Sequence, residues 1–129
     1  MDTEKTGQDK KGFTLVELLI AMILVGVLAA VAIPLMQTNV NKAKKSEAVA
    51  AMGVIRTAAT LYGIEYNSVP SSMDNLLING FINQGDLNGT YYNYSNYSYG
   101  AGIINASTPP GVIGPSITMD ADGNISNYQ

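Results

Sequence analysis

The stretch that decides the fold of this chain is Lys10-Lys11-Gly12-Phe13-Thr14-Leu15-Val16-Glu17-Leu18-Leu19-Ile20. Two lysines and a glycine precede an apolar run that lasts to Met36, and Glu17 is the one charged residue inside that run. The 19 residues from Leu18 to Met36 carry no charge. At about 1.5 Å per residue, a helix of this length nearly spans the roughly 30 Å hydrocarbon core of a bilayer. The run therefore predicts a transmembrane helix with one carboxylate near its start.

Placing the ionised carboxylate of Glu17 in such a segment costs free energy. An ionised carboxylate costs about 2.5–3.5 kcal/mol at the middle of a bilayer and less near the interface. No basic residue lies in the same apolar segment. We therefore expect Glu17 to find its partner elsewhere, which is the first indication of function.

Residues 12–20 resemble the N-terminal signature of type IV pilins and of the related pseudopilins of type II secretion. In that family a membrane peptidase cleaves after the glycine and methylates the new N-terminal residue, commonly phenylalanine. The resemblance implies a leader of residues 1–12, cleavage between Gly12 and Phe13, and a mature chain of 117 residues. It covers residues 10–36 strongly, and the later part of the chain matches only in layout.

The resemblance also implies roles for residues inside the apolar helix. It implies that Glu17 pairs with the α-amine of Phe13 on a neighbouring subunit and guides each new subunit into register. The α-amine of the same chain could also approach Glu17, and a glutamate that reaches the membrane surface with no role beyond topology is the plain alternative. Proline lacks a backbone donor, so Pro34 predicts a kink or loosening of the helix around residues 31–33. An ordinary kinked transmembrane helix would explain this proline. In the family, however, glycine and proline at the positions of Gly26 and Pro34 bracket a segment that loses helicity in the filament.

A secretory signal with a cleavage site at Ala30-Val31-Ala32 is an alternative interpretation, and it would give a mature chain that starts at Ile33. Two features oppose it: the apolar run exceeds the usual 7–15 residues of such a signal, and it contains Glu17. The lysines do not orient the segment, because three precede it and three follow it. A cytoplasmic N-terminus is what the resemblance implies.

Composition argues against an enzyme. The chain of 129 residues contains no His, no Cys and no Trp. Histidine and cysteine supply the usual general bases, thiolate nucleophiles and transition-metal ligands. A membrane-anchored hydrolase would have only Asp and Glu as its catalytic base. The absence of Cys also leaves the redox compartment open.

Residues 37–69 predict an amphipathic continuation of the helix, which ends at Asn67-Ser68-Val69-Pro70. A continuous helix from Phe13 to about Tyr66 would be roughly 80 Å long. The charged residues Lys42, Lys44, Lys45, Glu47 and Arg56 lie largely off the apolar stripe, and a solvated face is the default interpretation of the lysines. The stripe consists of Val40, Ala43, Ala48, Met52, Ile55, Ala59, Tyr62 and Tyr66.

Residues 70–129 predict a small turn-rich head. Asn, Gly, Ser and Pro make up 28 of these 60 residues, which favours many turns and short strands. Residues 71–77 predict a short capped helix that Gly80 closes. Such a head has a marginal core, so we expect it to pack on the apolar stripe. The fold class is α+β, with residues 13–36 as the transmembrane half of a long helix, residues 37–69 as its amphipathic half, and a small antiparallel β-sheet.

The tyrosines at positions 91, 92, 94, 97 and 99 alternate with Asn and Ser. This pattern favours a strand and hairpin with half-buried rings. Sugar contacts, surface adhesion and electron transfer along a fibre are more specific alternatives. The helix from Thr14 to Leu61 contains no aromatic residue, which argues against electron transfer. Five N-x-S/T sequons are explained mostly by chance in a head so rich in these residues.

Residues 117–126 predict a terminal β-hairpin with Asp-Gly at the bend. The oxygens of Asp120, Asp122 and Asn124 have a spacing that also suits Ca²⁺. The full calcium loop, however, requires glycine at its sixth position, where this chain has Ile125. The hairpin is the favoured interpretation. Calcium stays an alternative, because major pseudopilins have a similar layout and bind calcium in the head.

The function that we infer from the sequence is structural: a subunit of a helical, homo-oligomeric filament like a type IV pilus. The resemblance implies a prepilin peptidase, an inner-membrane assembly platform and membrane lipid as partners. The filament would then stand outside the membrane, extracellular or periplasmic. The head carries no Lys or Arg, which argues against nucleic-acid binding through it. The alternatives are a pseudopilin of a type II secretion system and a secreted soluble binding module.

Overall fold

The computed structural model describes residues 11–128, so most of the expected leader, residues 1–10, lies outside the described residues. The described chain divides into two compact units, one up to Gln37 and one from Thr38 onward. The elements are helices α1 (Leu15–Tyr66) and α2 (Met73–Ile78), two 3-10 helices (Gln84–Leu87 and Tyr94–Asn96), and strands β1 (Tyr97–Gly100), β2 (Ile103–Ala106), β3 (Ile117–Met119) and β4 (Ile125–Ser126).

Helix α1 includes the apolar run and its amphipathic continuation, as the sequence predicted. It ends at Tyr66, and the next residue, Asn67, has a φ of 48°. A left-handed residue directly after the last turn is a common way to end a helix, and Asn adopts this conformation more readily than most residues. Pro70 disfavours the helical conformation for the residue before it, Val69, so α1 does not resume there.

The four strands form one antiparallel sheet in the order β1-β2-β3-β4. Strands β1 and β2 pair over their full length, with Tyr97 opposite Ala106 and Gly100 opposite Ile103. The turn between them has positive φ at both Ala101 and Gly102, which matches the twist of a two-residue hairpin. The α+β class, a long N-terminal helix with a small antiparallel sheet, is therefore confirmed.

The tyrosine run forms a hairpin only in its second part. Tyr97 and Tyr99 lie on β1 and point into the core, where burial raises the pKa of each phenol. Tyr94 begins a 3-10 helix instead of a strand, and Asn93 caps this helix by accepting a hydrogen bond from the Ser95 amide (3.0 Å). The local side-chain bonds of Asn and Ser, which compete with strand pairing, explain the difference.

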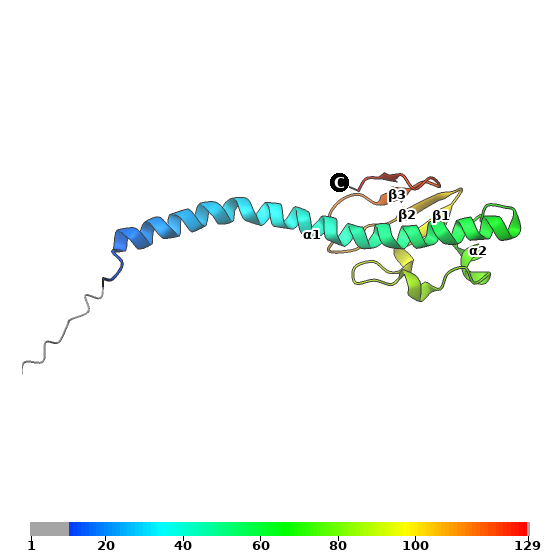
Figure 1. Ribbon diagram of the computed structural model, residues 1–129, viewed down its shortest axis with the longest axis horizontal. Coiled ribbons are helices and arrows are strands. Elements are labelled where there is room, and N and C mark those ends of the chain that lie inside the picture. The colour runs from blue at the N-terminus through cyan, green and yellow to red at the C-terminus, as the bar shows by residue number, and fades with distance from the viewer. Residues whose placement is uncertain (1–10, 129) are drawn as a thin grey trace, which may run out of the picture. The chain divides into compact units, whose positions relative to one another are not determined.

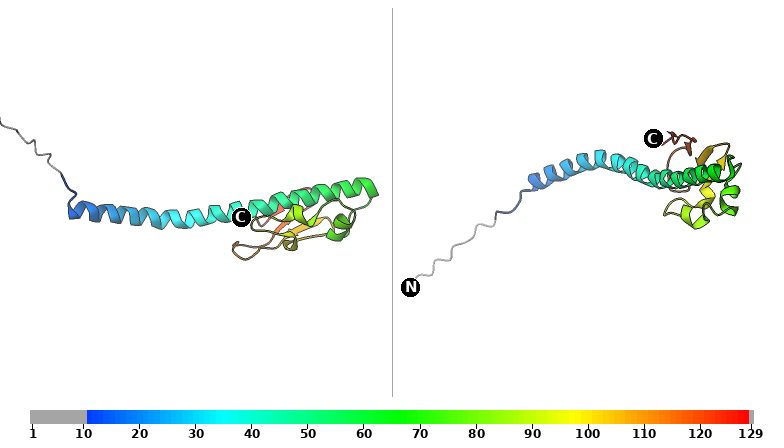
Figure 2. Two further views of the ribbon diagram at one scale, coloured as in Figure 1. Left: turned by 90° about the horizontal axis from the view of Figure 1, so that it is seen from below. Right: turned by 45° about the vertical axis from the view of Figure 1, so that its right-hand side comes forward.

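Within the second unit, the sheet and α2 pack against α1 (Figures 1 and 2). Ala48, Met52 and Ile55 of the predicted stripe have no exposed surface. The ends of the stripe differ from the expectation, because Val40 is 40% exposed and Tyr66 is 50% exposed. The head covers the middle of the stripe most completely. At its far end Tyr66 packs against Tyr62 and against Phe81 of the head, with ring centroids 4.6 and 6.2 Å apart.

The prediction of a solvated lysine face is wrong for Lys45, which is 2% exposed. Its ammonium donates to the carbonyl of Asn127 (3.5 Å) near Gly114, where a Cβ atom would lie 2.7 Å from Nζ. The neighbouring Lys44 donates to the carbonyl of Gly111 (2.8 Å). Long lysine stems can pack on apolar surface while the charged tip reaches a polar group. These two lysines therefore join α1 to the C-terminal loops of the head.

Glu47, an anionic side chain on the same part of α1, also links the helix to the head. Its carboxylate accepts hydrogen bonds from three successive backbone amides, those of Thr90 (3.0 Å), Tyr91 (2.8 Å) and Tyr92 (2.7 Å). Gly89 leaves room for the carboxylate, since any Cβ atom there would overlap it. Desolvation raises the pKa of Glu47, but the three amide bonds outweigh that effect and the net pKa is lowered.

We predict that Glu47→Gln, which keeps the shape of the side chain and removes its charge, destabilises the head at pH 7 by about 1–2 kcal/mol. Because the folded pKa of Glu47 is lowered, its contribution is present above the unfolded pKa of about 4.3 and is lost as pH falls through the folded value. The free energy of unfolding of the variant and the wild type is measured at each pH by urea unfolding of the detergent-solubilised chain, with the circular dichroism of the tyrosines as the signal. Equal acid sensitivity of variant and wild type between about pH 5 and pH 3 would contradict the assignment.

A second prediction concerns the shared core. Since Met52 and Ile55 supply fully buried surface to the head, a fragment of residues 70–129 should not unfold cooperatively, whereas a fragment of residues 38–129 should. Calorimetry of both fragments tests this. Cooperative melting of the shorter fragment would mean that the sheet needs no helix.

Candidate functional site

The expected cleavage point lies just ahead of α1. Gly12 and Phe13 are exposed and outside any helix, and Phe13 is 82% exposed. Among the described residues, no heavy atom would lie within 4 Å of a Cβ atom on Gly12. Residues 11–128 therefore give no steric reason for glycine at this position.

The first turn of α1 contains a capping box that the sequence analysis missed. The backbone amide and the hydroxyl of Thr14 both donate to Glu17 Oε2, at 2.8 and 3.0 Å. In return, the amide of Glu17 donates to Thr14 Oγ1 at 3.2 Å. The spacing T-x-x-E directly before an apolar run is the known signal for this motif. Thr14 therefore joins the candidate site as a positioning residue.

The capping box changes the interpretation of Glu17. Its carboxylate has a hydrogen-bond partner in its own chain, so it is not without any partner in this segment. Hydrogen bonds to a hydroxyl and an amide do not neutralise the charge, however, and a cation nearby remains favourable. The α-amine that cleavage would create on Phe13 lies next to Thr14 in sequence. Phe13, Thr14 and Glu17 thus lie within five residues of one another at the start of α1.

The side chains in the apolar part of α1 are exposed in the single chain. The large apolar side chains from Leu15 to Met36 are between 52% exposed, at Ile20, and 81% exposed, at Leu15. Among the described residues, α1 is the helix that is long and apolar enough to cross a membrane. Exposed apolar surface costs roughly 25 cal/mol per Å² in water. This surface therefore requires lipid or other protein chains as its surroundings.

Gly26 and Pro34 both lie within α1, and both are helical and exposed. A Cβ atom on Gly26 would meet nothing within 4 Å, so packing within one chain does not require glycine there. The predicted loss of helicity between these two residues concerns an assembled state and stays a prediction.

The terminal turn holds the residues of the calcium alternative. Asp120 accepts hydrogen bonds from the backbone amide of Asn124 (2.8 Å) and from its side-chain amide (2.9 Å), and these bonds lower the pKa of Asp120. Arg56 donates to the carbonyl of Asp122 (3.0 Å). Asn124 therefore presents its NH₂ group to Asp120, and a guanidinium lies beside the turn. This arrangement suits the hairpin. Calcium binding stays a prediction and has no place in the function proposed below.

Comparison with known proteins connects this geometry to a family. Residues 7–33 match the prokaryotic N-terminal methylation motif. The chain is 37% identical over 82 residues to a fimbrial protein of Neisseria meningitidis and 40% identical over 63 residues to the type IV major pilin protein PilE1 of Neisseria gonorrhoeae. These matches cover 64% and 49% of this chain, and 46% and 38% of the two relatives.

A protein of a secretion system is also similar to this chain. The chain is 31% identical over 72 residues to the type II secretion system core protein G of Pectobacterium carotovorum, a match that covers 56% of this chain and 46% of the relative. The chain thus spans about half the length, or less, of these curated relatives. The matched methylation motif includes Gly12, Phe13 and Glu17, and the resemblance of this chain to type IV pilins and type II secretion pseudopilins is confirmed.

Proposed function

We propose that this chain is the structural subunit of a type IV pilus-like helical filament. The observation that carries the proposal is the contrast between the two halves of α1. The half from Thr38 onward packs under a small head with a completed core, whereas the half up to Met36 leaves its apolar side chains more than half exposed. A helix that is apolar all round and bare in one chain is suited to bundling with copies of itself.

The same apolar surface has two successive environments in this proposal. Before assembly, lipid surrounds residues 13–36 and the chain is stored in the inner membrane. During assembly, an inner-membrane platform transfers the chain into a filament, where helices of neighbouring copies replace lipid. Because lipid tails are as apolar as leucine, the hydrophobic effect alone gives little net drive for this transfer. Polar contacts within the apolar layer, such as those of Glu17, then determine register.

Processing is the first step of the proposal. A prepilin peptidase would cleave between Gly12 and Phe13 and methylate Phe13. The exposure of both residues and their place outside α1 support access to that bond. The match to the N-terminal methylation motif also favours this site over the secretory alternative with its start at Ile33.

A second candidate function is a pseudopilin of a type II secretion system, which the similarity to core protein G favours. The two functions use the same processing and the same helix packing, so the site does not separate them. Deletion of the gene separates them: loss of surface filaments supports the pilus, and retention of secreted enzymes inside the cell supports secretion.

We predict that Gly12→Val blocks processing. The described fold leaves open space at Gly12, so the substitution should not disturb folding, and the full-length precursor should accumulate in the membrane. Intact-mass measurement of the wild-type subunit should show a chain that starts at Phe13 with one added methyl group. A wild-type chain that starts at Ile33 would establish the secretory alternative.

A further prediction separates the two possible roles of Glu17. Gln at this position can still complete the capping box, but it carries no charge. If pairing with a neighbouring α-amine is the role of Glu17, both Glu17→Leu and Glu17→Gln should be inserted and cleaved normally and yet fail to polymerise. Filament counts by electron microscopy, with processing confirmed by mass, give the readout. Wild-type filament counts from Glu17→Gln would show that capping is sufficient.

A further inference from the structure

The loop of residues 107–116, which joins β2 to β3, holds an isoleucine outward. Val112 is 8% exposed and belongs to the core, whereas its neighbour Ile113 is 72% exposed. Two hydrogen bonds tie the loop to α1. The amide of Ile113 donates to the side-chain oxygen of Asn41 (3.5 Å), and the ammonium of Lys44 donates to a backbone carbonyl of the loop (2.8 Å). The buried neighbour and the two bonds fix Ile113 on the surface of the second unit.

This attachment keeps the loop close to the end of the apolar run. Asn41 follows Met36, the last residue of that run, by five positions. Five residues span at most about 18 Å when extended and roughly 7.5 Å in a helix, and α1 is helical throughout this stretch. The headgroup layer of a bilayer is roughly 5–7 Å thick on each side of the hydrocarbon core. When the apolar run spans that core, Ile113 is therefore within reach of the headgroups.

The most exposed aliphatic side chain of the described head lies at the other end of the second unit. Ile78 is 82% exposed, but the side chain of its neighbour Asn79 accepts a hydrogen bond from the hydroxyl of Tyr66 (3.2 Å), the last residue of α1. Tyr66 is 25 positions beyond Asn41 on the same helix, or roughly 38 Å along its axis. The length of the helix thus selects Ile113, and not Ile78, for contact with a membrane.

The helix beside the loop is basic. Residues 38–46 contain three lysines and no acid, and the loop itself contains no charged residue. Lys42, the first of the three, is exposed. The next acid along α1 is Glu47, and its carboxylate is already engaged with three backbone amides of the head. The surroundings of Ile113 therefore favour an anionic partner.

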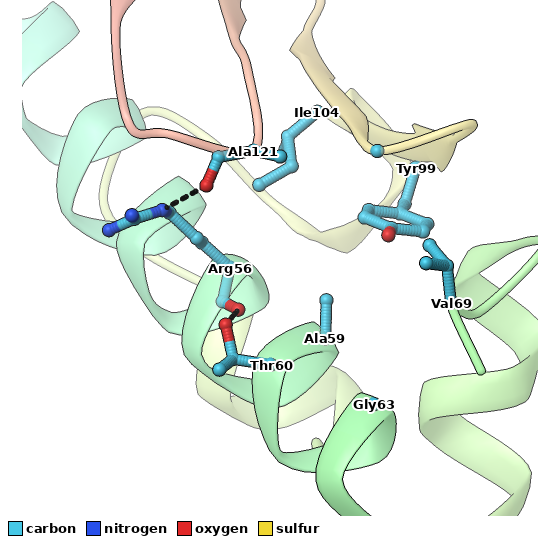
Figure 3. A pocket seen from close by; sticks show the side chains of 9 residues that line it. Arg56, Ala59, Thr60, Gly63, Val69, Tyr99, Ile104 and Ala121 are labelled. Carbon is cyan, nitrogen blue, oxygen red and sulfur yellow. Dashed lines mark hydrogen bonds between the residues drawn. The ribbon is translucent and has the colours of Figure 1, made fainter. Parts of the chain in front are cut away.

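The acidic turn between β3 and β4 lies farther along α1. Arg56 donates from Nε to the carbonyl of Ala121 (2.8 Å), the bond drawn in Figure 3, and from Nη2 to the carbonyl of Asp122 (3.0 Å). Arg56 is 15 positions beyond Asn41, or roughly 22 Å along the helix axis. The acids of this turn therefore do not offset the lysines beside Ile113.

We propose that the surface formed by Val40, Lys42 and Ile113 docks the head on anionic phospholipid headgroups before assembly. Val40 is 40% exposed and immediately precedes Asn41, which holds the loop. Aliphatic groups gain free energy when they leave water, and each lysine near an anionic membrane surface strengthens binding. The inference rests on the proposed function, which stores the chain in a membrane, and it adds a lipid contact of the head that must break when the chain enters a filament.

Quenchers carried by lipids test this contact, because the chain has no native cysteine and single cysteines can be labelled. The full chain carries an environment-sensitive dye on Ser116→Cys, an exposed position of the same loop that leaves Ile113 intact. It is reconstituted into vesicles of phosphatidylethanolamine and phosphatidylglycerol that contain a lipid with a nitroxide on its headgroup. The matched control is Ser68→Cys, an exposed position just after α1. Ala30→Cys, within the apolar run, reports insertion through a lipid with a nitroxide on its acyl chain.

Quenching of the dye at positions 30 and 116, with little at position 68, supports the contact. Quenching at position 30 with equal quenching at positions 116 and 68 overturns it and leaves the proposed function intact. A dye at position 116 whose emission shifts to the blue without quenching is covered by a second copy and not by lipid, which also overturns the contact. Without quenching at position 30 the chain is not inserted, and the membrane step of the proposed function fails together with the inference.

Two substitutions of exposed residues test the side chains themselves, with the dye at position 116. Ile113→Ser should lower the docking equilibrium constant about tenfold, because less apolar surface leaves water. Lys42→Gln should lower it about fivefold in vesicles that contain phosphatidylglycerol and should have no effect in vesicles of phosphatidylcholine alone. Both variants should melt like wild type. Unchanged quenching in either variant, in vesicles with phosphatidylglycerol, would overturn the assigned surface.

Discussion

The hydrogen bonds from three consecutive backbone amides to Glu47 hold the head on its helix. The amides of residues 90–92 belong to an irregular segment ahead of β1, so no strand satisfies them, and the carboxylate does so instead. Gly89 lets the segment approach closely enough. Lys45 reaches the C-terminal segment of the head in the same region of α1. After these polar contacts along α1, the head covers Ala48, Met52 and Ile55. The core of this small head is complete only because α1 contributes to it.

The contacts of Lys45 and Glu47 with the head explain why the second part of α1 differs from the first. From Thr38 onward α1 is half core and half surface, and its buried positions are those that the sheet and α2 cover. Before Gln37 the large apolar side chains of the helix are all more than half exposed. A soluble domain would not tolerate such a segment, whereas the proposed filament subunit, which would move from lipid into a bundle of like helices, requires it.

Much of this fold could be predicted from the sequence, because it depends on local signals. The apolar run predicted the first half of α1, Asn67 and Pro70 predicted its end, and the Asp-Gly bend predicted the last hairpin. The polar contacts that Lys45 and Glu47 make with the head could not be predicted in the same way. Periodicity placed Lys45 and Glu47 off the apolar stripe, but their partners lie 43–82 positions away in the chain. In the candidate site, Gly12, Phe13 and Glu17 were predicted from their pattern, and their roles stay predictions. The Thr14 cap was missed, because the signature was read for its charge and not for its hydrogen bonds.

The cap also bears on how a carboxylate can persist in an apolar helix before assembly. In the single chain, two donors of Thr14 satisfy one oxygen of Glu17, which lowers the cost of keeping the group in the first turn. Neither donor is charged, so most of the attraction for a cation remains. The second oxygen, Oε1, takes no part in the Thr14 bonds and is the atom that can accept an α-amine from a neighbouring copy. In the proposed filament, such a subunit would be stable in lipid before assembly and would gain a strong, directional bond from a neighbouring copy during assembly. We therefore expect alanine at position 14 to remove the stabilisation before assembly and to leave the bond to the neighbouring copy, so that Thr14 would serve storage and Glu17 would serve assembly.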